Sequence, residues 1–324
     1  MTKKSVPRKH HYLPQFYLRR FSVSGDGLYQ IGKSDGRIMP VKIKDVAAIR
    51  DFHVLDDDGT LDRHALETEL AKVEGKMAPH LANLLGGGFN HLPTQLYVKQ
   101  FLSMLRMRVP AIRDHIQTSM SDVVHEELKS MEERGRLPTP PEGMESVLRV
   151  ENLHVEIKNR AIMEKMFRLG GNDDVLEIYY SMQPTLLHAP LGSWFITSDQ
   201  PVALYHPQPY LTLGVGPEDP DVVISLPLSS RTALLLANNK RLMFDSCHPG
   251  IERIATADEV HEINRRTVMM AKDWIFTGES PASLSALIEG TRGHSCGLTY
   301  KKIQTKNGVG FLMQNIAVGP KLPI

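Results

Sequence analysis

Two adjacent histidines near the start of the chain carry the densest group of chemically useful side chains. His10 and His11 precede Pro14, whose ring restricts the backbone beside them. Successive side chains alternate along a regular strand, so the two imidazoles converge only in an irregular turn. Converging histidines are suited to bind a divalent metal, or to act as a general acid and a phosphate-binding partner. The alternative is a basic arm with solvated histidines.

The same stretch carries three further polar side chains and a basic flank. Gln15, Tyr17 and Arg19 are predicted to bind substrate. Six cations and no acid occur in the first twenty residues: Lys3, Lys4, Arg8, Lys9, Arg19 and Arg20. A basic segment of this kind is suited to track a nucleic-acid backbone, so nucleic acid is a predicted partner.

A second group of reactive side chains follows the apolar run 194–197. Ser198 and Asp199 stand at the end of this predicted strand, ahead of Pro201, where function often collects. Asp199 is a candidate metal ligand or a partner that orients a histidine, and Ser198 is a candidate nucleophile. The flanks of Ser198 lack the Gly-x-Ser-x-Gly elbow. A turn in which both side chains bond backbone amides is the competing interpretation.

Paired acids and an arginine on predicted helices complete the candidates. Glu67 and Glu74 are seven residues apart, so they project near one helix face and are suited to hold a metal. Arg106 lies among Met and Leu residues, where it either clamps an anionic substrate or pairs with a buried acid. The metal candidates are His10, His11, Glu67, Glu74 and Asp199, with Mg²⁺, Mn²⁺ or Zn²⁺ as the ion.

Three segments resemble one bacterial family. Residues 10–21 read His-His-x-x-Pro-x-Phe-Tyr-Leu-x-x-Phe, and residues 195–202 read Phe-Ile-Thr-Ser-Asp-Gln-Pro-Val. A third, Leu226-Pro-Leu-Ser229, leads to a strand and then to a helix that contains Asn264, a predicted substrate-binding residue. Together with the Glu67-x6-Glu74 spacing, these segments resemble the family called domain of unknown function 4238. The sequence departs from it at Gln200, where Asn is common. The resemblance implies a shared fold and shared site positions, without a known activity.

Composition narrows the class of protein. The chain has 324 residues, 41% hydrophobic and 23% charged, which is typical of a globular protein with a full core. Cys247 and Cys296 are its two cysteines, so a disulfide scaffold is excluded and a reducing compartment is favoured. No apolar run approaches the ~20 residues of a membrane helix. We expect a cytoplasmic protein without membrane contact, and no nucleotide-cofactor motif is present.

The elements that must position these residues predict an α+β fold. We expect an N-terminal β-rich segment over 1–60, a helical region over 61–170, and over 171–324 an antiparallel or mixed sheet with flanking helices, in one compact domain. Apolar spacing predicts helices over 62–85, from Thr94 to about Arg136 with a break at Pro110, over 144–169 and over 256–271. Short β-type runs include 175–181, 222–226 and 232–237. Asn307-Gly308 predicts a hairpin turn.

Three functions follow from these residues. The first is a metal-dependent hydrolase acting on a phosphodiester, resembling a nuclease. The second is a non-catalytic binding or protein-interaction module, in which the His-His segment is a docking element. The third is a metal-independent hydrolase that uses Ser198 with a histidine base.

Overall fold

The computed structural model describes most of the chain as an α+β protein. It describes residues 9–57, 60–144, 146–206, 216–238, 251–294, 298–305 and 308–315. The cations Lys3, Lys4 and Arg8, both cysteines Cys247 and Cys296, and Asn307 of the predicted hairpin turn lie outside the described residues.

The larger sheet has five strands and is mixed. Its order is β12 (Ile251–Ile254), β7 (Gln183–His188), β11 (Thr232–Ala237), β10 (Val223–Pro227) and β9 (Ala203–Tyr205). β12 runs parallel to β7, and the other neighbours are antiparallel. The predicted strands over 222–226 and 232–237 are thereby confirmed.

A second, antiparallel sheet joins two strands near the N-terminus to two strands from the second half of the chain. Its order is β3 (Ile38–Lys42), β2 (Gly27–Gly32), β13 (Trp274–Thr277) and β8 (Thr197–Ser198). Trp274 of β13 is the partner of Gly32 in β2. The N-terminal β-rich segment is therefore completed by a strand from far along the chain.

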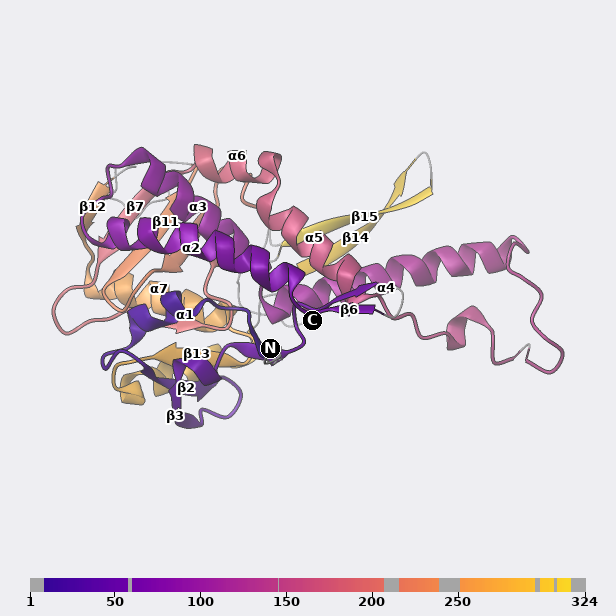
Figure 1. Ribbon diagram of the computed structural model, residues 1–324, viewed down its shortest axis with the longest axis horizontal. Helices are drawn as coiled ribbons and strands as arrows, with labels where there is room; N and C mark the ends of the chain where they lie inside the picture. Colours follow the sequence, from indigo (N-terminus) through magenta and orange to yellow (C-terminus); the bar gives the residue numbers. More distant parts are fainter. Residues whose placement is uncertain are drawn as a thin grey trace, which may run out of the picture.

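The five-stranded sheet is covered on both faces, which explains its continuous apolar strands. Leu234 and Leu236 of β11 belong to the main apolar core, which includes residues of α2 (Ala65–Leu85), α3 (Leu92–Met107) and α5 (Asn159–Gly171). The alternate residue Leu235 packs in a separate cluster with Val260 and Ile263 of α7 (Ala257–Met270). In Figure 1, α2 and α3 cross in front of this sheet, and α7 lies between it and the smaller sheet.

The remaining elements extend the body. They are α1 (Gln15–Leu18), α4 (Pro110–Glu133), α6 (Asp173–Ser181), α8 (Ser285–Thr291), the pairs β1 (Lys9–His11) with β4 (Ala48–Arg50) and β5 (Leu55–Asp57) with β6 (Thr60–Asp62), and the hairpin of β14 (Leu298–Thr305) and β15 (Gly308–Asn315). α4 projects from the body as an arm (Figure 1). Among the described helices, none has the length and apolar character to cross a membrane.

One predicted strand is wrong, one predicted helix begins later than expected, and one break is confirmed. In the described part of 144–158, the one helical element is a short 3-10 turn (Val150–Asn152), so the helix predicted over 144–169 begins at Asn159. Residues 175–181 belong to helix α6 rather than a strand, because Asn172 caps the helix by accepting the N–H of Val175. The predicted break at Pro110 is confirmed, since α3 ends at Met107 and α4 begins at Pro110.

Candidate functional site

The two histidines lie on a regular strand and therefore diverge. β1 pairs antiparallel with β4, with His10 opposite Ile49. His10 is fully buried, whereas His11 is half-buried and lines a cleft. The convergence of His10 and His11 on one metal thus does not occur, because strand alternation directs their side chains to opposite sides.

His10 instead meets a histidine from the turn that follows β4. The backbone N–H of His53 donates to Nδ1 of His10 at 2.9 Å, and the two rings stack with centroids 5.6 Å apart. Both side chains are buried, at 0% and 1% exposed. Nε2 of His53 is buried and has no hydrogen-bond partner among the described residues. An imidazole with an unsatisfied buried nitrogen is energetically costly, so this position favours a ligand.

Glu67 completes the group from the first turn of α2. Its carboxylate forms a short contact with Nδ1 of His53, and the same oxygen lies 3.9 Å from Nδ1 of His10. The positive end of the α2 dipole stabilises an ionised carboxylate at this place. One candidate ligand atom each from His10, His53 and Glu67 lies within 4.8 Å of the others. A tetrahedral ion with bonds of about 2.1 Å requires ligand atoms about 3.4 Å apart, so small side-chain shifts suffice.

The protonation states of this group suit metal binding. Burial lowers the pKa of His53 to about 4, while its hydrogen bond to Glu67 opposes the shift. Burial alone acts to raise the pKa of Glu67, but the hydrogen bond with His53 and the nearby His53, His10 and Arg108 side chains lower it overall. At neutral pH the site therefore holds a neutral imidazole at His53 and an ionised carboxylate at Glu67, which are the forms that bind metals.

One hydrogen bond competes with a metal at His10. Its Nδ1 lone pair already accepts the N–H of His53. Ligation by His10 consequently requires this bond to break, or the ring to turn and present Nε2. His53 contacts Glu67 through Nδ1, so His53 would bind an ion either through its unpartnered Nε2 or through Nδ1 after this contact is replaced.

A polar cleft of about 340 Å³ adjoins the group. Glu67 lines this cleft, and most of the other lining residues belong to α1, α2 and the end of β1. The lining side chains are His11, Pro14, Gln15, Phe16, Arg19, Glu67, Leu70, Ala71, Glu74 and Arg108. The predicted substrate-binding residues Gln15 and Arg19 lie here and pair with each other, since Arg19 donates to Gln15 at 3.0 Å. Burial lowers the pKa of His11, so its imidazole is neutral at neutral pH.

Glu74 serves as an ion-pair partner in this cleft. It accepts a hydrogen bond from Arg108 at 2.7 Å, and Arg108 also donates to the backbone oxygen of His11 at 2.8 Å. Glu74 lies two turns from Glu67, about 10.5 Å along the helix axis, which is too far to share one ion. The structure thus separates Glu74 and His11 from the predicted metal set, and Arg108 fixes β1 against α2.

The turn that carries His53 is fixed from α5. The amide of Asn159 donates to the backbone oxygens of Phe52 and Val54, which flank His53. Asn159 in turn accepts from Arg113, whose guanidinium lies over the ring of Phe52. Such a second layer orients a ligand, and it makes the position of His53 rigid.

Tyr17 connects the segment 10–21 to the segments 195–202 and 226–229, the three that resemble the family. Its side chain is fully buried, with its hydroxyl 2.8 Å from Thr197 Oγ1 and 2.8 Å from the backbone oxygen of Pro227. Burial raises the pKa of this phenol. The predicted contact of Tyr17 with substrate has no room here, and its role is to join α1 to β8 and β10.

Asp199 and Ser198 accept backbone N–H groups, as in the turn that was the alternative to a metal ligand and a nucleophile. Asp199 is 3% exposed and accepts the backbone N–H groups of Lys272, Asp273 and Trp274 at 2.7–3.0 Å. Ser198 is fully buried in β8 and accepts the N–H of Gln200. Within the described chain, Asp199 shares no candidate metal group with His10 or Glu67. The predicted pocket that joins Asp199 to the N-terminal histidines is therefore absent from the described structure.

Arg106 and Asn264 also make structural contacts. Arg106 is buried and donates to the hydroxyl of Tyr179 at 3.0 Å. The amide of Asn264 accepts from the N–H of Ile196 and donates to the oxygen of Trp194. Arg106 therefore belongs to the core, whereas Asn264 also forms part of a second groove described below.

A second group of metal-type side chains lies beside β9 and β10. His206, Asp219 and Asp221 have ligand atoms within 4.8 Å of one another. Asp219 accepts the N–H of Asp221 at 2.9 Å, and Asn238 donates to the backbone oxygen of Asp219. These bonds are those of a turn that uses Asp219 as its side-chain acceptor.

His53 is the site residue that sequence reasoning missed. It lies 43 positions after His10, and no ligand spacing relates the two. A histidine between the apolar residues Phe52 and Val54 is the one signal that the sequence offers, because that pattern places an imidazole near the core.

Comparison with known proteins gives a family but no activity. No curated protein and no solved structure matches the chain. A match to the family described as "Protein of unknown function (DUF4238)" extends over residues 9–280, which includes the histidine strand, Glu67, the Thr197–Asp199 turn and Asn264. The chain belongs to the DUF4238 family.

Proposed function

We propose that the protein is a divalent-metal-dependent hydrolase that cleaves phosphodiesters in the manner of a nuclease, with His10, His53 and Glu67 as its metal ligands. The observation that carries this proposal is the meeting of two buried imidazoles and a carboxylate beside a polar cleft. Two histidines and one glutamate form a ligand set that holds zinc in hydrolases, with a fourth position open to water.

The cleft supplies groups for the remaining parts of the reaction. A bound ion activates water and offsets the charge that develops on a phosphate. His11 lines the cleft with a neutral imidazole, so it is placed to accept a proton from the water or to return it to the leaving oxygen. Arg19 is exposed at the cleft and offers a cation to a substrate phosphate.

Positive charge on the N-terminal segment favours a phosphodiester over a neutral ester. Lys9, Arg19 and Arg20 are exposed on the described part of the basic N-terminal segment. Their positive charge attracts a polyanion, and nucleic-acid binding through this segment is expected to weaken as salt rises.

A non-catalytic binding module is the second candidate. It is favoured by the hydrogen bond from His53 to His10 and by the contact between His53 and Glu67, because these bonds satisfy much of the group without an ion. Under this alternative, the three residues are a buried polar cluster that fixes β1 against α2. A serine hydrolase has less support, because Ser198 is fully buried inside β8.

The test compares two glutamates on the same helix. Glu67→Gln removes the proposed ligand, and Glu69→Gln changes an exposed residue paired with Lys72. We expect isothermal titration to show binding of Zn²⁺ or Mn²⁺ to the wild type and to Glu69→Gln, and a loss of more than about 100-fold in metal affinity for Glu67→Gln. Single-stranded RNA and DNA are expected to be cleaved by the two metal-binding proteins only.

A second test replaces a histidine and has its own control. His53→Ala is expected to abolish binding and cleavage, and His154→Ala, at an exposed site, is expected to retain both. Added metal is expected to raise the melting temperature of the wild type, since an ion that binds only the folded state stabilises it. Protein that binds no Mg²⁺, Mn²⁺ or Zn²⁺ and leaves RNA and DNA intact would favour the binding module.

A further inference from the structure

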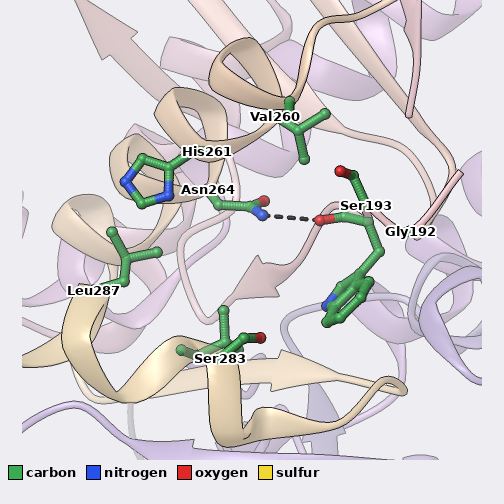
Figure 2. A pocket seen from close by; sticks show the side chains of 10 residues that line it. Gly192, Ser193, Val260, His261, Asn264, Ser283 and Leu287 are labelled. Atoms are coloured by element: carbon green, nitrogen blue, oxygen red, sulfur yellow. Dashed lines mark hydrogen bonds between the residues drawn. The ribbon is translucent and has the colours of Figure 1, made fainter. Parts of the chain in front are cut away.

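A groove separate from the metal group lies between α7, α8 and the loop before β8. It has a volume of about 210 Å³ and shares no lining residue with the cleft of His11 and Glu67. Figure 2 shows Ser193 on one side, His261 and Asn264 of α7 on another, and Ser283 opposite them. Trp194, Val260, Leu284 and Leu287 add apolar walls.

The walls of this groove are held in place before any ligand binds. The Asn264 amide bonds the oxygen of Trp194 (dashed in Figure 2) and the N–H of Ile196, which ties the loop to α7. The guanidinium of Arg231 donates to the backbone oxygens of Ala189, Pro190 and Ser193. A loop fixed at both ends loses little conformational entropy on binding, so the groove is preorganised.

Three polar side chains in this groove, two of them exposed, are left available for a ligand. The hydroxyls of Ser193 and Ser283 and the imidazole of His261 have no hydrogen-bond partner among the described residues. They lie around one hollow that also has an indole wall. Hydroxyl and imidazole groups donate and accept, so they suit a ligand with hydroxyl or amide edges.

The charge of the lining narrows the class of ligand. No Asp, Glu, Lys or Arg is among the described residues that line the groove. An ionised ligand would lose hydration without gaining an opposite charge, whereas a neutral polar ring keeps its hydrogen bonds and packs a face on Trp194. The volume is below the ~300 Å³ typical of drug-sized sites, so one ring fits.

We propose that this groove is a second binding site, which takes a single neutral polar ring such as a pyranose or a nucleoside base. The site is independent of the proposed hydrolysis, because none of its residues contributes to the metal group or its cleft. Asn264 acts as a positioning residue, and Ser193, His261 and Ser283 contact the ligand.

The test uses saturation-transfer NMR with the full chain and three probes. Methyl β-D-glucopyranoside and 1-methyluracil are the neutral probes, each with one ring, and glucose 6-phosphate is the charged one. We expect at least one neutral probe to bind with a dissociation constant of about 1 mM, as its size allows, and glucose 6-phosphate to bind more weakly than that probe. The two neutral probes distinguish a sugar site from a base site.

Two neighbouring residues give a matched pair of variants. Ser283→Phe fills the groove, and Ala282→Phe adds the same ring at an exposed position that does not line it. We expect Ser283→Phe to abolish the transfer and Ala282→Phe to retain it. His261→Ala, at an exposed helix position, is expected to weaken binding about tenfold through one lost hydrogen bond. If Ser283→Phe melts at a lower temperature than the wild type, the affinity of His261→Ala tests the site in its place.

The proposal is overturned if neither neutral probe shows saturation transfer at a concentration about ten times the expected dissociation constant. It is also overturned if binding survives in Ser283→Phe, or if glucose 6-phosphate binds as tightly as the neutral rings. Metal affinity and nucleic-acid cleavage do not enter these measurements, so failure here leaves the proposed hydrolase untouched, and the reverse also holds.

Discussion

Replacing Tyr17 with Phe tests whether the His-His-x-x-Pro-x-Phe-Tyr segment is joined to the rest of the fold by one hydroxyl. The change removes the oxygen that lies 2.8 Å from both Thr197 Oγ1 and the Pro227 carbonyl. It leaves the ring, which packs against Phe21 and Phe101, in place. Apolar burial is therefore unchanged, and the effect reports the two hydrogen bonds.

The magnitude follows from burial. Each buried hydrogen bond contributes about 1 kcal/mol net, and a buried carbonyl left without its donor costs about 1–3 kcal/mol more. The hydroxyl of Thr197 can rotate toward another acceptor, so Pro227 carries most of the second cost. We expect the free energy of unfolding to fall by about 2–4 kcal/mol, a large part of the 5–15 kcal/mol typical of a folded protein.

The assay is urea unfolding followed by circular dichroism, with Tyr29→Phe as the control. Tyr29 is 37% exposed on β2, so its change is expected to alter stability by less than about 0.5 kcal/mol. Combining Tyr17→Phe with Thr197→Val is expected to show coupling of about 1 kcal/mol in a double-mutant cycle. Equal unfolding midpoints for Tyr17→Phe and Tyr29→Phe would refute the structural role of the hydroxyl and reopen a contact between Tyr17 and substrate.

Two further changes test the turn and the ion pair. Burial raises the pKa of Asp199 to about 6 against three opposing backbone donors, so the folded state binds this proton more tightly than the unfolded state. The contribution of Asp199 to the free energy of unfolding therefore falls by up to about 3 kcal/mol as pH rises from about 4 to about 6. Asp199→Asn is expected to lack this pH dependence in urea unfolding across the same range. The variant is also less stable at every pH, because its amide N–H faces other N–H donors. Arg108→Lys cannot keep both the Glu74 and the His11 contacts with one ammonium, so we expect a loss of about 2 kcal/mol in urea unfolding; an unchanged midpoint would show that this ion pair does not fix β1.

Local patterns predicted the elements whose periodicity and packing agree. Leu70, Met77, Leu81 and Leu84 share the buried face of α2, and the apolar spacing of that helix indicated this face. β11 was evident as an apolar run because both faces of its sheet are covered. Where propensity and packing disagree, packing decides: Val175–Ser181 is rich in β-type residues, but Leu176 and Tyr179 are three positions apart and bury one helical face.

The candidate site could be predicted only in part, for a related reason. His10 and Glu67 were selected as candidates from residue type. The alternation of side chains along a strand predicted that His11 faces away from His10 if that strand is regular. The partner His53 depends on the pairing of β1 with β4 and on Asn159 from α5, which are tertiary contacts with no local signature. Asp199 was equally compatible with a ligand and a turn, and the backbone of residues 272–274 decided between them.

The pairing of β2 with β13 sets an order for biosynthesis. Strand β2 is translated early, but its neighbour β13 emerges only after Trp274 is added, 242 residues after Gly32. At about 5–20 residues per second, the ribosome needs about 12–48 s for that interval. During this time strand β2 lacks its neighbour β13 and has an open edge, so this sheet is completed only late in synthesis or after release. A truncation before β13 leaves that edge unpaired.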